Sequence, residues 1–100
     1  MTASPTPAMP EAAWQGRVLD LARLCAWRAF HDHDSRRNAA GLPDLLLVRG
    51  DRLVAAELKA ERGRLRAGQR EWLAALDRVA GVETYVWRPS DWATVMAVLR

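Results

Sequence analysis

The sequence contains one cysteine, one lysine and no long apolar run. The lack of cysteine and of apolar runs excludes several kinds of site and of membrane attachment. Cys25 is the only cysteine, so an internal disulfide and zinc sites built on C-x-x-C pairs are excluded. No apolar run approaches the roughly 20 residues of a membrane-spanning helix. The first residues also lack the basic start and apolar stretch of a signal peptide. We therefore expect a cytoplasmic protein with no membrane partner.

Lysine is almost absent from a basic chain. Lys59 is the only lysine among 15 basic residues, and all the others are arginine. The net charge is +3 and the pI about 10.0. Most of the arginines lie between Arg36 and Arg70, interleaved with glycine, a pattern that suits phosphate binding. A solvated basic surface would look the same, so charge alone leaves nucleic-acid binding open.

The length and composition indicate one folded domain. The 100 residues are half hydrophobic and 27% charged, which is typical of a globular chain. Residues 1–10 differ, because they hold three prolines and no charged side chain. We expect a flexible tail over 1–10 and a single domain over 11–100.

The hydrophobic spacing predicts an α/β domain with a small mixed sheet flanked by helices. Apolar residues share one face of each expected helix, and this pattern predicts that the tryptophans, Trp72 included, lie mainly in the core. Ser90 is the expected N-cap of the last helix. The expected elements are a helix over 11–26, a short strand over 27–32, a polar loop over 31–41, a hairpin over 43–59, a basic loop over 60–68, a helix over 69–81, a strand over 82–87 and a helix over 88–100.

The expected hairpin brings three charged residues to one face. With Gly50-Asp51 as a two-residue turn, Arg49 faces Arg52, and counting outward places Asp44 opposite Glu57. Directly opposed residues share a face of the sheet. Lys59 lies two residues beyond Glu57 and points to the same face.

Two opposed carboxylates favour a metal site. Like charges in this position are destabilising, and a hard divalent cation between them removes that cost. Lysine is a compact point donor, which suits it to orienting water or a phosphate group beside the metal. The alternative is that Pro43-Asp44 is an ordinary turn and that Glu57 and Lys59 pair on a solvated face.

These residues also form a known motif. The segments "GLPDLLLV" and "VAAELKA" resemble the PD-(D/E)xK nuclease motif, with Pro43-Asp44 followed by Glu57, Leu58 and Lys59. The flanking segments "WRAFHDHDSRRNAAGLPDLLLVRG", "ERGRLRAGQREWLAAL" and "YVWRPSDW" follow in the order typical of stand-alone VRR-NUC (virus-type replication-repair nuclease) domains of phages and bacteria. The resemblance covers residues 11–100.

The resemblance implies a restriction-endonuclease-like core and a phosphodiesterase site that uses Mg²⁺ or Mn²⁺, with no small-molecule cofactor. It implies that Asp44, Glu57 and the backbone carbonyl of Leu58 bind the metal, and that Lys59 serves the attacking water. Gln69 would order the site. Glu11 and Gln15 match polar positions on the first helix, and Glu11 would touch the metal through water.

The arginine-rich loops are the expected DNA contacts. Before Asp44 these are His33, Ser35, Arg36 and Arg37, and after Lys59 they are Arg62, Arg64 and Arg66, with Arg70 at the following helix. A solvated surface remains the alternative for each group. The "HDHD" run over 31–34 lacks partner ligands at zinc-like spacing, so we expect no zinc site there.

The leading hypothesis is a structure-selective DNA endonuclease that acts as a dimeric Holliday-junction resolvase in a bacterial or phage-infected cell. Two alternatives remain. One is a nuclease of the same chemistry that cuts flaps, nicks or plain duplex. The other is a DNA-binding module without catalysis, against which the complete Asp-Glu-Lys trio argues.

Overall fold

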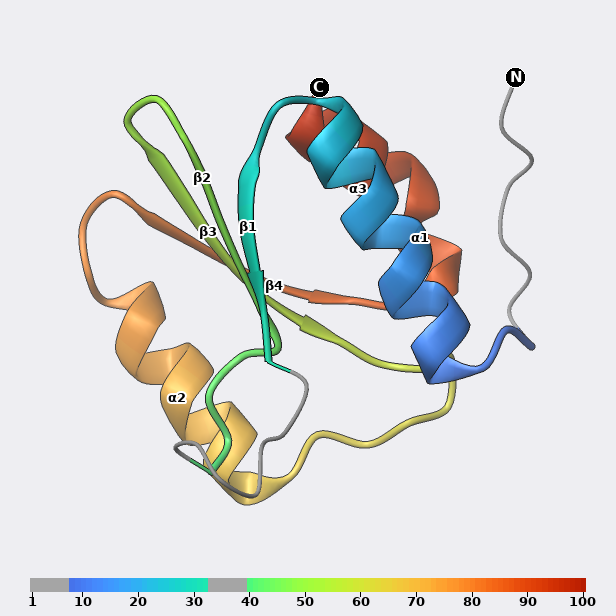
Figure 1. The fold of residues 1–100 in the computed structure, drawn as a ribbon. Coiled ribbons are helices and arrows are strands. Elements are labelled where there is room, and N and C mark those ends of the chain that lie inside the picture. Colours follow the sequence, from blue (N-terminus) through green and yellow to red (C-terminus); the bar gives the residue numbers. More distant parts are fainter. Residues whose placement is uncertain (1–7, 33–39) are drawn as a thin grey trace.

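The computed structural model describes residues 8–32 and 40–100. Within them the fold is a four-stranded sheet between two layers of helix (Figure 1). The elements in chain order are α1 (Glu11–Leu24), β1 (Arg28–His31), β2 (Leu45–Arg49), β3 (Arg52–Leu58), α2 (Ala67–Asp77), β4 (Val82–Trp87), the 3-10 turn η1 (Pro89–Asp91) and α3 (Trp92–Leu99).

The sheet is mixed, in the order β1-β2-β3-β4. The first three strands run antiparallel, and β4 lies parallel to β3. The parallel pair requires a crossover, which α2 supplies. This arrangement confirms the predicted α/β class and is that of a restriction-endonuclease-like core.

The hairpin has the predicted register. Arg49 lies opposite Arg52, and the ladder continues to Leu45 opposite Ala56. Gly50 takes a φ of +62° at the first turn position, a conformation that glycine adopts without the steric cost of a Cβ. The next pair outward is Asp44 and Glu57, at the end of the ladder.

One face of the sheet forms the main core. Leu45 and Leu47 on β2 and Val54, Ala56 and Leu58 on β3 alternate toward this face and are buried. The helices α1 and α3 cover them, as the right-hand layer in Figure 1. Their buried contacts come from Trp14, Val18 and Ala22 on α1 and from Trp92, Val95 and Leu99 on α3.

The helix α2 packs on the opposite face, against β3 and β4 (Figure 1). It begins two residues before the predicted start, at Ala67, and ends at Asp77 rather than 81. None of its residues is buried, and Trp72 is 37% exposed, so the prediction that Trp72 belongs to the core is wrong. The sheet covers the apolar face of α2 only in part, because α2 lies at the edge of a small domain.

The end of the chain also differs from its prediction. A 3-10 turn precedes α3, and Ser90 is not the N-cap of a helix over 88–100. Instead, the backbone nitrogen of Ser90 donates to Glu61 Oε1 at 2.9 Å and its Oγ donates to Oε2 at 2.7 Å. Pro89 cannot donate a backbone hydrogen bond and begins the turn. No helix in 8–32 or 40–100 has the length and apolar character needed to cross a bilayer.

Candidate active site

The end of the hairpin brings the predicted acidic residues and the lysine together. Asp44 directly precedes β2, Glu57 lies near the end of β3, and Lys59 follows β3. All three point to the face of the sheet that α2 partly covers. Gln69 reaches the same place from the first turn of α2, where its side chain contacts Glu57.

Glu57 is a buried carboxylate with one orphaned oxygen. It is 1% exposed, and Gln69 Nε2 donates to its Oε1 at 3.1 Å. Its Oε2 is buried and accepts no hydrogen bond from any described residue. The pKa of Glu57 is raised from 4.5 to about 8, first by burial and then by a hydrogen bond with Asp44 and the negative charge of Asp44, whereas Lys59 lowers it. Two carboxylates this close must share a proton or a cation.

Asp44 is held on both sides of its strand. Its Oδ2 accepts a hydrogen bond from the backbone nitrogen of Leu58 at 3.2 Å. Its backbone oxygen accepts one from the nitrogen of Asp32 at 2.8 Å, which carries the β1-β2 ladder past the end of β1. In a strand, one residue's N–H and C=O point to the same side, so the Leu58 carbonyl also faces Asp44.

Lys59 is fixed through its backbone and shielded along its side chain. It is 9% exposed, unusually low for lysine. Its backbone nitrogen donates to the oxygen of Trp87 at 3.0 Å, and the same oxygen accepts Trp14 Nε1 at 2.9 Å. The ammonium group is close enough to Glu57 to lower that residue's pKa. The β3-β4 pair and α1 therefore fix where Lys59 leaves the sheet.

Gln69 links the start of α2 to the acidic pair. Its Oε1 accepts the backbone nitrogen of Arg66 at 2.8 Å, which satisfies a helix-end donor, while its Nε2 donates to Glu57. Gly41 and Gly68 fix this helix against the loop before Asp44. A Cβ on Gly41 would lie 2.4 Å from the carbonyl carbon of Gly68, and the φ of Gly41 is +88°.

The first helix contributes charge near the site. Glu11 is half-buried at the start of α1, and its negative charge is one of the causes of the raised pKa of Glu57. Gln15 lies one turn further along and is also half-buried. No hydrogen bond joins Glu11 to Glu57, and the predicted contact of Glu11 with a metal through water stays a prediction.

The predicted DNA contacts are partly described. His33, Ser35, Arg36 and Arg37 lie outside the described residues. Arg62, Arg64 and Arg66 are exposed in the loop between Lys59 and α2. A cavity of about 330 Å³ connects Arg66 to Asp44, and it is lined by Ala40, Gly41, Leu42, Asp44, Arg66, Gly68 and Gln69.

Two residues near the site were missed by sequence reasoning. Asp32 is buried and lies opposite Asp44, on the same face. The two-residue alternation of Arg28 and Phe30 along β1, continued one step past the strand, reaches Asp32 and could have indicated its position. Arg88 donates from Nη1 to the backbone oxygens of Ala60 at 2.8 Å and Gly63 at 2.6 Å, so it holds the loop that follows Lys59. Nothing in the sequence indicates this second contact.

The donor set fits a hard divalent cation. Asp44 and Glu57 supply two carboxylates, and the Leu58 carbonyl faces the same space. Glu57 Oε2 is a buried oxygen without a hydrogen-bond partner in the described part of the chain. Mg²⁺ is commonly bound by one or two carboxylates, with waters completing the octahedron. Three or more histidine, cysteine or acidic side chains that could hold a metal do not gather anywhere in the described residues, so a zinc-type cage is not found there.

A comparison with known protein families identifies the family of this chain. The chain matches the VRR-NUC domain over residues 6–91. This span contains Asp44, Glu57, Lys59 and Gln69 and ends before α3. The curated proteins and the solved structures give no match. Since the matched segment covers most of the 100 residues, the chain belongs to the VRR-NUC family of nuclease domains.

Proposed function

We propose that this VRR-NUC domain is a divalent-metal-dependent DNA endonuclease that hydrolyses phosphodiester bonds. The observation that carries the proposal is the pairing of Asp44 with a buried Glu57 whose Oε2 has no partner among the described residues, beside a buried lysine. A structural ion pair would place Lys59 against that oxygen. Here the oxygen is left for a ligand.

Each residue has a distinct role in the proposal. Asp44, Glu57 and the Leu58 carbonyl hold Mg²⁺, or Mn²⁺ in its place. When bound, the cation supplies Lewis-acid stabilisation of charge on the phosphate. Lys59 orients the attacking water and the phosphate oxygens. The water oxygen bonds to phosphorus, one P–O ester bond breaks, and the products are a phosphate monoester and a free hydroxyl group.

Branched DNA and a homodimer form the finer part of the proposal. Phe30 on β1 is 52% exposed and Val48 on β2 is 43% exposed, on the face that carries Asp44. A second copy packed on this apolar face by two-fold symmetry would place two sites on one side of the dimer. Two sites are what paired cuts in a four-way junction require, one for each strand.

The test compares a labelled four-way junction with matching linear duplex in Mg²⁺, Mn²⁺ or EDTA. Asp44→Ala and Lys59→Ala serve as variants, and light scattering gives the mass with and without DNA. Metal-dependent cutting of the junction that both variants lose is the expected result. Equal cutting of both substrates would leave the nuclease and remove the junction preference. Binding without cutting in either metal would indicate a DNA-binding module, and a monomer in every condition would remove the dimer.

A further inference from the structure

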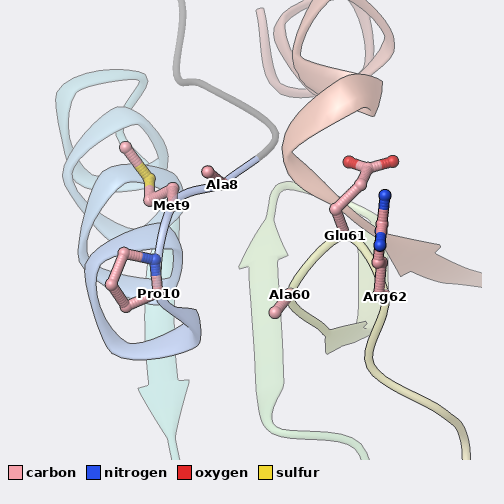
Figure 2. Close-up of a pocket in the computed structure, with 6 residues that line it drawn as sticks. All are labelled: Ala8, Met9, Pro10, Ala60, Glu61 and Arg62. Carbon is pink, nitrogen blue, oxygen red and sulfur yellow. The ribbon is translucent and has the colours of Figure 1, made fainter.

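A groove of about 520 Å³ lies beside the lysine end of the site. One wall is the segment that leads into α1, and the other is the loop that follows Lys59 (Figure 2). The lining residues are Ala8, Met9, Pro10, Ala60, Glu61 and Arg62. The groove therefore begins one residue after Lys59 and one residue before Glu11.

Two hollows in the surface lie next to residues of the candidate site. One is the cavity lined by Asp44, Arg66 and Gln69. The groove adjoins the lysine end of the site, since Ala60 directly follows Lys59 and Pro10 directly precedes Glu11. A DNA strand whose phosphate sits at Asp44 and Glu57 has a neighbouring nucleotide on each side. A neighbouring nucleotide on the Lys59 side would meet the groove.

The wall after Lys59 is rigid. Arg88 Nη1 lies 2.8 Å from the oxygen of Ala60 and 2.6 Å from that of Gly63. Both carboxylate oxygens of Glu61 accept hydrogen bonds from Ser90, which lower the pKa of Glu61 and direct its charge toward the start of η1. The negative charge nearest the groove is thus already bound by donors of the protein.

The chemistry of the lining suits an unstacked nucleotide. Four of the six lining residues are apolar, Ala8, Met9, Pro10 and Ala60, and they offer flat or polarizable surfaces to a base or sugar. Arg62 is exposed and makes no ion pair or hydrogen bond with the described residues, so its guanidinium is available to a phosphate or a base edge. A volume of about 520 Å³ falls within the ~300–1,000 Å³ of small-molecule sites.

We infer that this groove binds one unpaired nucleotide next to the phosphate that is cut. The inference rests on the proposed nuclease function and extends it, because it makes the unpaired state of that nucleotide a requirement for efficient cutting. A base held in a duplex cannot enter a groove between two protein walls. The enzyme therefore selects junctions, flaps or ends by the nucleotide that they leave free to be displaced.

The test uses DNA in which the cut position of the wild-type enzyme has been mapped. The nucleotides on either side of that phosphate are made paired or unpaired, one at a time, and cutting is followed in Mg²⁺. In EDTA, 2-aminopurine at each of these positions reports where a base enters the protein. The variants are Ala60→Leu, which fills the groove, and Arg62→Ala, which removes its cation. Arg23→Ala, an exposed arginine in the last turn of α1, is the control.

The expected result has three parts. Wild type and Arg23→Ala cut the substrate with one particular unpaired neighbour about tenfold faster than the paired one, in line with the stacking of a single base. Ala60→Leu and Arg62→Ala lose this ratio while they melt at the wild-type temperature. The 2-aminopurine signal changes at that same position with wild type and stays unchanged with Ala60→Leu.

Two outcomes separate this inference from the proposed function. If wild type cuts DNA but the paired-to-unpaired ratio is the same in all four proteins, the groove inference is wrong and the nuclease stands. If no protein cuts, 2-aminopurine is instead placed at each position around the branch point; a response to wild type and not to Ala60→Leu then means that the nucleotide site stands and the nuclease is wrong. A 2-aminopurine signal that is equal in wild type and Ala60→Leu overturns the groove in either case.

Discussion

Gln69 and Glu57 are joined by a hydrogen bond of 3.1 Å that connects the first turn of α2 to the buried end of β3. The amide orientation is fixed at both ends, because its oxygen accepts from the backbone nitrogen of Arg66 while its nitrogen donates to Glu57. The amide donor to Glu57 is therefore held by a helix end. The geometry of the acidic pair depends on how α2 begins.

Replacement of Gln69 tests this dependence. Gln69→Ala removes the donor that favours ionised Glu57, so metal binding must compete with a more tightly held proton. We expect a loss of about 10–100-fold in apparent metal affinity or activity, the usual effect of removing a residue that orients a metal ligand. Mg²⁺ titration of the cleavage rate and Mn²⁺ binding by calorimetry measure it. Glu71→Gln, an exposed change on the same helix, is the control, and equal Mg²⁺ midpoints in both variants would contradict the role.

The buried Glu57 predicts the pH dependence of stability in metal-free protein. Its pKa is about 8 in the folded chain and 4.5 ordinarily, so between these values the folded chain keeps a proton that the unfolded chain has released. The free energy of unfolding then falls as pH rises, by up to ~1.4 kcal/mol per pH unit. The contribution is complete below pH 4.5 and is lost as pH rises toward 8.

Denaturant unfolding in EDTA at several pH values between 5 and 8 measures this slope. Glu57→Gln should flatten it and be more stable than wild type at pH 8, because the amide carries no charge to bury. Divalent cations bind the ionised form, so Mn²⁺ should stabilise wild type more at pH 8 than at pH 6. Parallel pH profiles for wild type and Glu57→Gln would show that another group carries the dependence.

Gly41 should tolerate no side chain. An added Cβ would lie 2.4 Å from the carbonyl carbon of Gly68, and the φ of +88° is itself unfavourable for an L-residue. Gly41→Ala should cost about 2–4 kcal/mol of stability, from conformational strain and from overpacking together. Gly50→Ala is the matched control, because Gly50 also has a positive φ but no atom within 4 Å of the added Cβ. If the denaturant midpoints of Gly41→Ala and Gly50→Ala coincide, the contact with Gly68 does not contribute to the loss of stability.

The sequence predicts the features that depend on interactions between residues close together in the chain, and it misses those that depend on distant residues. Period-two alternation and the Gly50-Asp51 turn fix the β2-β3 register, and with it the neighbourhood of Asp44 and Glu57. Arg49 and Arg52 show what local patterns miss. Opposed arginines look repulsive, yet their guanidinium groups lie 4.5 and 5.0 Å from the centroid of the Trp27 ring. Arg49 also donates to Cys25 and Leu99 oxygens at the ends of α1 and α3.

These contacts join residues far apart in the sequence, so no spacing rule finds them. The exposure of Trp72 has the same origin, since a helical stripe shows which residues share a face but not how much of that face the sheet covers. The sequence neighbours of Ser90 predict a capping role, whereas its hydrogen-bond partner Glu61 lies in another loop.

Arg88 provides the last test, because it acts on the loop after Lys59 without belonging to the acidic pair. Arg88→Ala removes hydrogen bonds to the oxygens of Ala60 and Gly63, which should cost ~1–3 kcal/mol of stability. The released loop also places Lys59 less precisely, so kcat should fall by about tenfold or more while the KM for DNA changes little. Arg88→Lys should recover part of the rate, because an ammonium group replaces only some of the bonds of a guanidinium.

Trypsin distinguishes a loosened loop from a general loss of stability. Its cleavage points after Arg62 and Arg64 lie in the loop that Arg88 holds, whereas Arg23 lies on α1. Local release predicts faster cutting at Arg62 and Arg64 alone, since a local opening exposes only its own segment. Arg78→Ala, at the end of α2, controls for the loss of an arginine. Equal acceleration at all three sites would mean that Arg88 stabilises the whole fold and that its effect on Lys59 is indirect.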